Sequence, residues 1–271
     1  MTLTAILVLV LTGLGAGFAG GLFGIGGGVV IVPALYAAFT GMGMAEDEAI
    51  KTAIATSMAT IIVTSIRSVM RHHRHDNVDW PVLKAWMPGL AVGAILGSVI
   101  ARYIDGQVLT GIFGAGLILL ATQRLMSTRG NKQTTEGTMP SQPAQHGIAG
   151  AVGAFSSLLG IGGGVIGVLL LTQFGRSVHR AVGTAAGFGL AIAIPGTFGY
   201  LWPAATDTEV MPWRIGLVSI VGFLAIASGT FFGAPIGAST AAKLDAKLLT
   251  RIFASYAALT GILMLKEAVF G

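Results

Sequence analysis

The sequence predicts an all-α, polytopic membrane protein, and three observations indicate this fold class. Of the 271 residues, 54% are hydrophobic and only 10% are charged, whereas soluble domains contain about 25% charged residues. The mean hydropathy is +0.81, and the apolar runs are near-continuous, without the alternation expected of β-barrel strands. The 41 glycines follow no three-residue period, which excludes collagen, and the high apolar content excludes disorder.

Eight apolar segments account for most of the chain. Six of them are predicted to be single membrane-crossing helices, because a hydrocarbon core of about 30 Å needs about 20 residues of helix. These six are residues 50–70, 82–102, 108–125, 180–201, 213–240 and 248–269. The other two, 3–39 and 147–174, each contain a glycine run. Residues 1–45 lack the basic start of a signal peptide, so this stretch is expected to remain in the protein.

The two halves of the sequence resemble each other. Gly24–Val29 and Gly160–Val165 share the pattern Gly-Ile-Gly-Gly-Gly-Val, and Ala53–Thr56 matches Ala181–Thr184. A third block recurs as Gly93, Gly97, Asp105, Leu109, Ile112 and Phe113, then as Gly233, Gly237, Asp245, Leu249, Ile252 and Phe253. Because the blocks occur in the same order, the chain is predicted to be a tandem duplication. Its parts are a first membrane repeat, a cytoplasmic linker and a second membrane repeat, at residues 1–126, 127–146 and 147–271.

Loop charge predicts that the two repeats have opposite orientations in the membrane. Basic residues gather in four loops, which the positive-inside rule places in the cytoplasm: 67–84, 124–132, 176–180 and 243–251. The acidic loops 46–48 and 207–209 are then expected outside. Equivalent loops of the two halves carry opposite charge, which predicts inverted-topology repeats, an arrangement characteristic of secondary transporters.

Each glycine run is predicted to break a helix inside the membrane. Segment 147–174 begins and ends on the cytoplasmic side, and its 28 residues span only about 42 Å as helix, too little for two crossings. It is therefore expected to form two short helices that meet at Gly160–Gly164, and segment 3–39 to do the same at Gly24–Gly28. Each repeat would then contain one glycine-broken helix hairpin and about three transmembrane helices.

The two turns are expected to converge near the middle of the membrane, where they are candidates for an anion site. Glycine permits left-handed backbone and close approach of a ligand, and a restarting helix presents free N–H groups and partial positive charge. The alternative role of the glycines is close helix packing. The candidate substrate-binding residues are Gly24, Gly26, Gly27, Gly28, Thr56, Ser57, Gly160, Gly162, Gly163, Gly164 and Thr184. For each hydroxyl, a hydrogen bond to its own helix backbone is the competing role.

Few ionisable residues lie within the predicted spans. Lys51 and His179 occupy equivalent repeat positions, and Arg180 follows; all three are candidates for a charge or proton role. His179 could carry a coupling proton, because imidazole titrates near neutral pH. The cluster His72-His73-Arg74-His75 is interpreted as part of a basic cytoplasmic loop rather than a metal site, because its arginines would repel a cation.

Other chemistries lack the residues that they need. Neither glycine run continues into the Lys-Ser/Thr of a phosphate-binding loop, and no basic, aromatic-interleaved face indicates nucleic acid. The chain contains no cysteine, Ser-His-Asp set or HExxH motif, so neither an enzyme nor a cofactor is predicted.

The paired glycine runs in two inverted halves resemble the TauE/SafE sulfite exporter family of membrane permeases. The resemblance covers residues 4 to 269, although Pro33 of the first half is matched by Leu169 in the second. It implies export of a small sulfur-containing anion, sulfite or an organosulfonate such as sulfoacetate, across the bacterial inner membrane. The inverted duplication adds alternating access as the expected mechanism, with the lipid bilayer and the anion as partners and a proton as candidate coupling ion. A passive anion channel and a metal or cation permease served by the histidine cluster are the alternatives.

Overall fold

The computed structural model describes residues 3–23, 27–127, 139–201, 213–241 and 243–270. Its helices are α1 (Leu3–Phe23), α2 (Gly28–Gly41), α3 (Glu46–His73), α4 (Trp80–Tyr103), α5 (Gly106–Ser127), α6 (Gln142–Leu158), α7 (Gly164–Gln173), α8 (Val178–Leu201), α9 (Ile220–Ala241) and α10 (Ala246–Phe270). A short antiparallel hairpin, β1 (Arg214–Ile215) and β2 (Val218–Ser219), precedes α9.

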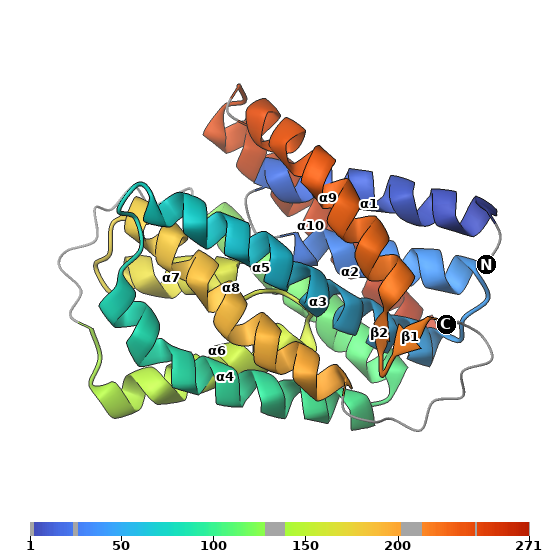
Figure 1. Ribbon diagram of the computed structural model, residues 1–271, viewed down its shortest axis with the longest axis horizontal. Helices are drawn as coiled ribbons and strands as arrows, with labels where there is room; N and C mark the ends of the chain where they lie inside the picture. The colour runs from blue at the N-terminus through green and yellow to red at the C-terminus, as the bar shows by residue number, and fades with distance from the viewer. Residues whose placement is uncertain (1–2, 24–26, 128–138, 202–212, 242, 271) are drawn as a thin grey trace.

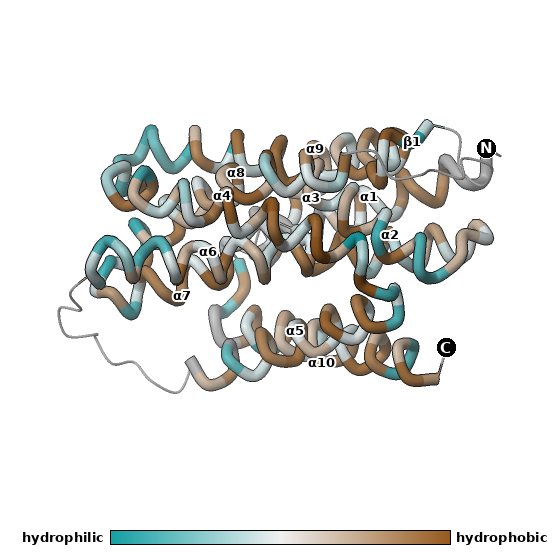
Figure 2. Tube along the Cα trace, turned by 90° about the horizontal axis from the view of Figure 1, so that it is seen from below, coloured by the Kyte–Doolittle hydropathy of each residue, from teal (hydrophilic) through white to brown (hydrophobic). Residues whose placement is uncertain are grey.

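Six of the described helices are long and apolar enough to cross a membrane: α3, α4 and α5, then α8, α9 and α10. Three of them fall in each predicted repeat, and each set follows a helix pair interrupted at a glycine run. Figure 2 shows hydrophobic residues along the middle of the helices and hydrophilic residues concentrated toward their ends. The prediction of an all-α, polytopic membrane protein is confirmed.

The helices pack in pairs taken from opposite halves of the chain. Helix α1 packs along α9, α6 along α4, and α5 along α10, while α3 and α8 contact each other at the centre (Figure 1). Helices α5 and α10 form a layer of their own on one side (Figure 2). This exchanged packing, in which a helix of one half lies against a helix of the other half, is expected of two repeats related by a two-fold axis.

Aromatic residues fill the interface between α4 and α8. Trp86 and Phe188 are fully buried, and their rings stack with centroids 5.2 Å apart. Asp79 caps the start of α4, where its carboxylate accepts a hydrogen bond from the Val82 N–H at 3.3 Å. Pro81 occupies the first turn of this helix, where a missing N–H costs nothing. Asp79 thus fixes the loop between α3 and α4 to the first turn of α4.

Two predicted segment boundaries differ from the structure. The apolar segment predicted at 213–240 begins with the β-hairpin, and its helix starts only at Ile220. The reason is the tight turn at Gly216, whose φ of +57° suits glycine and reverses the chain. Helix α6 begins at Gln142, inside the range predicted for the linker, with a proline in its first turn. Most of that linker and the acidic loop 207–209 lie outside the described residues.

Candidate functional site

The two glycine runs adopt the same conformation where their second helices begin. Gly27 precedes α2 with φ of 81°, and Gly163 precedes α7 with φ of 65°. Both values lie in the left-handed region, which glycine enters without the steric cost that a Cβ atom imposes. The first N–H groups of an α-helix generally have no partner within the helix, although in α2 the Val30 N–H donates to the Gly27 oxygen at 2.9 Å. The predicted helix restart is confirmed at both turns, although Gly24 and Gly26 lie outside the described residues.

The two turns meet inside the protein. A Cβ atom on Gly28 would lie 2.5 Å from the carbonyl oxygen of Gly160 and 2.9 Å from the Cα of Ile161. The Ser57 hydroxyl of α3 donates a hydrogen bond to the same Gly160 oxygen at 2.8 Å. The convergence of the two turns, predicted from the sequence, is therefore observed. Close packing through glycine, the alternative role, is also present at this contact.

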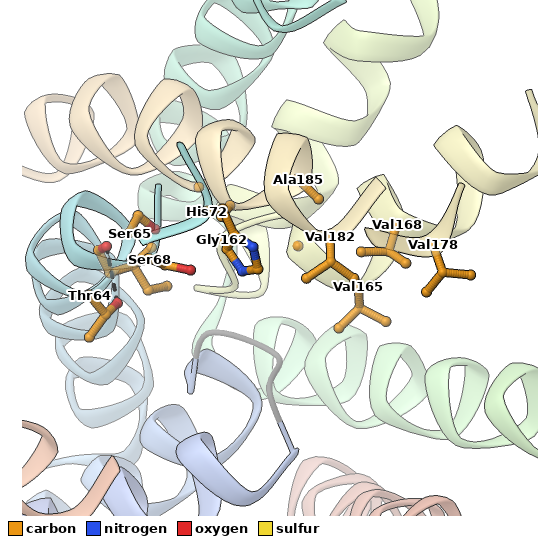
Figure 3. Close-up of a pocket in the computed structure, with 14 residues that line it drawn as sticks. Thr64, Ser65, Ser68, His72, Gly162, Val165, Val168, Val178, Val182 and Ala185 are labelled. Atoms are coloured by element: carbon orange, nitrogen blue, oxygen red, sulfur yellow. Dashed lines mark hydrogen bonds between the residues drawn. The ribbon is translucent and has the colours of Figure 1, made fainter. Parts of the chain in front are cut away.

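A cavity of about 270 Å³ lies beside the second turn. Its walls come from the second half of α3, the first part of α7 and the first half of α8, with Gly162 and Gly164 at the turn. Hydroxyls from α3 lie on one side and valines from α7 and α8 on the other, as Figure 3 shows: Thr64, Ser65 and Ser68 face Val165, Val168, Val178 and Val182. His72 also lines the cavity, and the described lining contains no Asp or Glu.

The chemistry of this cavity suits a small anion. Helix α7 begins at its wall, so the partial positive charge and free N–H groups of the helix start are available to a ligand there. Gly164 leaves space for it, since a Cβ at this position would meet no heavy atom within 4 Å. The Ser65 and Ser68 hydroxyls can donate further hydrogen bonds, whereas the Thr64 hydroxyl already donates to the Ile61 oxygen at 3.1 Å. The valines can contact an apolar part of the ligand. A carboxylate that would repel an anion is absent from the described lining.

The predicted hydroxyls Thr56 and Thr184 join the two halves of the protein. Thr56 Oγ1 accepts a hydrogen bond from the Ser219 N–H at 3.0 Å, just before α9. Thr184 Oγ1 accepts one from the Asp79 N–H at 2.9 Å, just before α4. Both hydroxyls are fully buried and neither lines the cavity. Equivalent threonines thus each hold the connection that leads into a helix of the other half.

An ion pair accompanies each of these threonine contacts. Arg214 Nη1 lies 2.6 Å from a carboxylate oxygen of Glu48, and Arg176 Nε lies 3.1 Å from one of Asp79. The arginine belongs to the second half and the carboxylate to the first half in both pairs. These contacts could not be predicted from the sequence, because residues so far apart in the chain give no periodic signal.

Replacing Thr56 or Thr184 by valine is expected to lower the free energy of unfolding by about 1–3 kcal/mol, because the buried Ser219 N–H or the partly buried Asp79 N–H loses its acceptor. Serine keeps the hydroxyl, so Thr56→Ser and Thr184→Ser should retain most of the stability. Thermal unfolding of the purified proteins in detergent measures the difference. Valine variants as stable as their serine counterparts would contradict this structural role.

The predicted charged residues lie away from the cavity. Lys51 forms an ion pair with Asp47, one turn earlier on α3, at 2.8 Å. His179 and Arg180 are exposed in the first turn of α8, and neither lines the cavity. Their charge or proton role therefore stays a prediction, and the structure does not bring them to the glycine turns.

His72 is the ionisable residue of the described cavity lining. Its basic neighbours predict a cytoplasmic loop at this position, whereas it lies in the last turn of α3. A signal for its position was present: Ile61, Ser65, Ser68 and His72 are spaced so that they share one helix face. Among the described residues, no group of three or more His, Asp or Glu side chains is arranged to hold a metal ion.

Comparisons with known proteins agree with this architecture. The family model described as "Sulfite exporter TauE/SafE" matches residues 9–264. A protein of Haemophilus influenzae named "Probable membrane transporter protein" is 33% identical over 261 residues, covering 96% of this chain and 98% of its own. Similarly named proteins of Methanocaldococcus jannaschii and Bacillus subtilis are 29% and 28% identical, over 95% and 97% of this chain and 94% and 98% of theirs.

No solved structure matches the chain. The family match nevertheless covers nearly the whole sequence, including both glycine turns, the long apolar helices α3, α4, α5, α8 and α9, and most of α10. The relatives are named as membrane transporters and not as enzymes. The chain is a multi-pass membrane transporter and belongs to the TauE/SafE sulfite exporter family.

Proposed function

We propose that the protein exports a small sulfur-containing anion, sulfite or an organosulfonate such as sulfoacetate, across the bacterial inner membrane by alternating access. The observation that carries this proposal is the cavity at the start of α7, which combines a helix N-terminus, three hydroxyls and a valine wall. The family match to sulfite exporters supports the substrate class.

The dimensions of the cavity suit this class of substrate. Its volume of about 270 Å³ leaves room for a small anion together with several water molecules. Sulfite would fit there with part of its hydration shell, whereas an organosulfonate would displace more of the water. In the proposed pose, the sulfur oxyanion accepts hydrogen bonds from the N–H groups at Gly164 and Val165 and from the Ser65 hydroxyl. The remainder of an organosulfonate would contact Val168 and Val182.

Binding without a buried arginine or lysine in the described lining has a kinetic advantage for an exporter. A fully paired charge in a low-dielectric site would hold the anion tightly and slow its release. Backbone N–H groups and hydroxyls supply a weaker field, so the anion can enter the cavity and leave it. The glycine turns of both halves are the proposed centre of this site, and Gly27 and Gly163 set the directions of the two helix starts.

Flux measurements with purified protein in proteoliposomes test the proposal. Radiolabelled sulfite is expected to show saturable uptake that empty liposomes lack, and unlabelled sulfoacetate is expected to compete. Repeating the measurement with a pH gradient shows whether a proton is coupled. No saturable flux of any anion in a panel of sulfite, sulfoacetate, sulfate and thiosulfate would overturn the proposal.

The same experiment distinguishes the two alternatives. A passive channel would equilibrate the anion but would not accumulate it against its gradient when a pH gradient is imposed. A cation permease served by the histidine cluster would lose activity when His72, His73 and His75 are replaced together by alanine, and it would show no anion flux. His73 already accepts a hydrogen bond from the Trp80 indole N–H at 3.3 Å, which favours a structural role for that member of the cluster.

A further inference from the structure

The cavity lies beside the second glycine turn. Because the two halves are predicted to be repeats, an equivalent position exists beside the first glycine turn. The repeated blocks align α8 with α3 and α7 with α2. In this alignment, three cavity residues of α8, Val182, Ala185 and Ala186, correspond to Ile54, Ser57 and Met58 of α3. Gly164 at the start of α7 corresponds to Gly28 at the start of α2.

The equivalent position is closed in this structure. Ile54, Ser57 and Met58 are all fully buried. The first turn of α2 is closed as well, since Gly28 contacts the backbone of Gly160 and Ile161, whereas Gly164 has open space around it. Equivalent residues therefore line a cavity in the second half and are sealed by packing in the first half.

The described contacts that form this seal include no ion pair. Ser57 of the first half donates a hydrogen bond to the Gly160 oxygen of the second half at 2.8 Å, and within the second half the Tyr200 hydroxyl donates one to the Ser157 oxygen at 2.9 Å. Met58 packs against Gly196 of α8, where a Cβ would lie 2.5 Å from the methionine Cε. Two hydrogen bonds and one flexible side chain can separate and re-form at much lower cost than a rigid buried ion pair.

Two hydroxyls near the seal lack hydrogen-bond partners. Ser156, which neighbours Gly163, and Thr197, which follows Gly196, are buried, and their oxygens have no hydrogen-bond partner among the described residues. An unpartnered buried hydroxyl is costly. Water or an anion would satisfy both groups if this region opened, which is an independent reason to expect a second conformation.

We infer that the protein has a second anion-binding cavity, closed in this conformation, between α3 and α8 beside the first glycine turn. Its walls are Ile54, Ser57 and Met58 together with Gly196 and Tyr200, and it opens toward the end of the molecule opposite His72. It takes the same class of small anion as the open cavity, bound at the start of α2. The inference rests on the proposed alternating access, because one cavity closes as the other opens.

Cysteine labelling tests this inference directly, since the chain contains no natural cysteine. Single cysteines are introduced by Ser57→Cys in the seal and Ala186→Cys in the open cavity. A third variant, Ala257→Cys, is the control, because Ala257 is fully buried on α10, outside both cavities. Each protein is exposed, in oriented membrane vesicles, to the membrane-impermeant anionic reagent sulfonatoethyl methanethiosulfonate from one face at a time.

The expected result is labelling of the two variants from opposite faces of the membrane. Ala186→Cys should react from the face that carries His72, and Ser57→Cys from the other face, while Ala257→Cys stays unlabelled. Ser57→Cys should also react at a rate that changes at least about threefold when sulfoacetate is added, because this sulfonate, unlike sulfite, does not attack the thiosulfonate reagent. Tyr200→Phe removes one hydrogen bond of the seal and should accelerate the labelling of Ser57→Cys severalfold.

Ile54→Cys, one helical turn before Ser57, repeats the measurement if Ser57→Cys does not fold. Variants that transport sulfite but cannot be labelled at either position from the second face would overturn the inference and leave the proposed function standing. Absence of anion flux in the unmodified protein would instead count against the proposed function. Labelling of Ser57→Cys and Ala186→Cys from the same face would also overturn the inference.

Discussion

Replacing Gly163 or Gly27 by leucine is expected to reduce anion flux to the level of empty liposomes, although the protein still inserts and folds. Both glycines adopt positive φ, at 65° and 81°, and a side chain there costs about 1–2 kcal/mol. At Gly163, the new Cβ would also collide with the end of the Ile192 side chain. Relief of this strain would rotate the start of α7 and misalign the N–H groups that face the cavity.

A matched control separates this effect from strain alone. Gly43, in the loop after α2, has a φ of +89°, and a Cβ there would meet no heavy atom within 4 Å. Gly43→Leu therefore carries the same backbone strain, but far from the turns, and should retain its flux. Gel filtration and thermal unfolding establish that all three variants fold. Flux retained by both Gly163→Leu and Gly27→Leu would refute the role of the glycine turns.

The sequence was sufficient to predict the membrane-spanning helices and the two helix breaks. Hydropathy depends on local composition, so the six long helices could be identified without knowledge of their packing. The breaks could be identified because a glycine run at equivalent positions in two repeats has few explanations other than a required backbone conformation. The inverted relation of the repeats remains a prediction from loop charge, which the exchanged packing of α1 on α9 and α6 on α4 supports.

The details of the site were less predictable. The substrate-binding role of Thr56 and Thr184 stays a prediction, and their observed partners, the N–H groups of Ser219 and Asp79, could not be predicted because they are more than 100 residues away in the chain. His72 was assigned to a loop because its neighbours Arg71 and Arg74 are basic, although helix periodicity continues to that point. The most important missing information is the one-sided opening, since symmetric sequence blocks cannot indicate which of two equivalent positions is open.

Alanine substitutions at the equivalent residues Gly28 and Gly164 are expected to have opposite effects, although both replace the first residue of a helix. At Gly28 the added methyl would lie 2.5 Å from the backbone oxygen of Gly160, and backbone cannot move aside as a flexible side chain can. Overpacking of this kind costs about 1–3 kcal/mol. At Gly164 the methyl enters open space, and the higher helix propensity of alanine is worth up to about 1 kcal/mol.

Gly28→Ala is therefore expected to lower the melting temperature of the protein in detergent, whereas Gly164→Ala leaves it unchanged or raises it. If the second cavity forms, separation of the turns relieves the strain at Gly28, so Gly28→Ala should also increase the labelling rate of Ser57→Cys severalfold. Gly164→Ala should decrease that rate, because its methyl would be crowded when the open cavity beside the second glycine turn closes. Equal effects of the two substitutions on the melting temperature and on the labelling rate would mean that the two turns do not alternate between packed and open surroundings. Alternating access around the turns would then be contradicted.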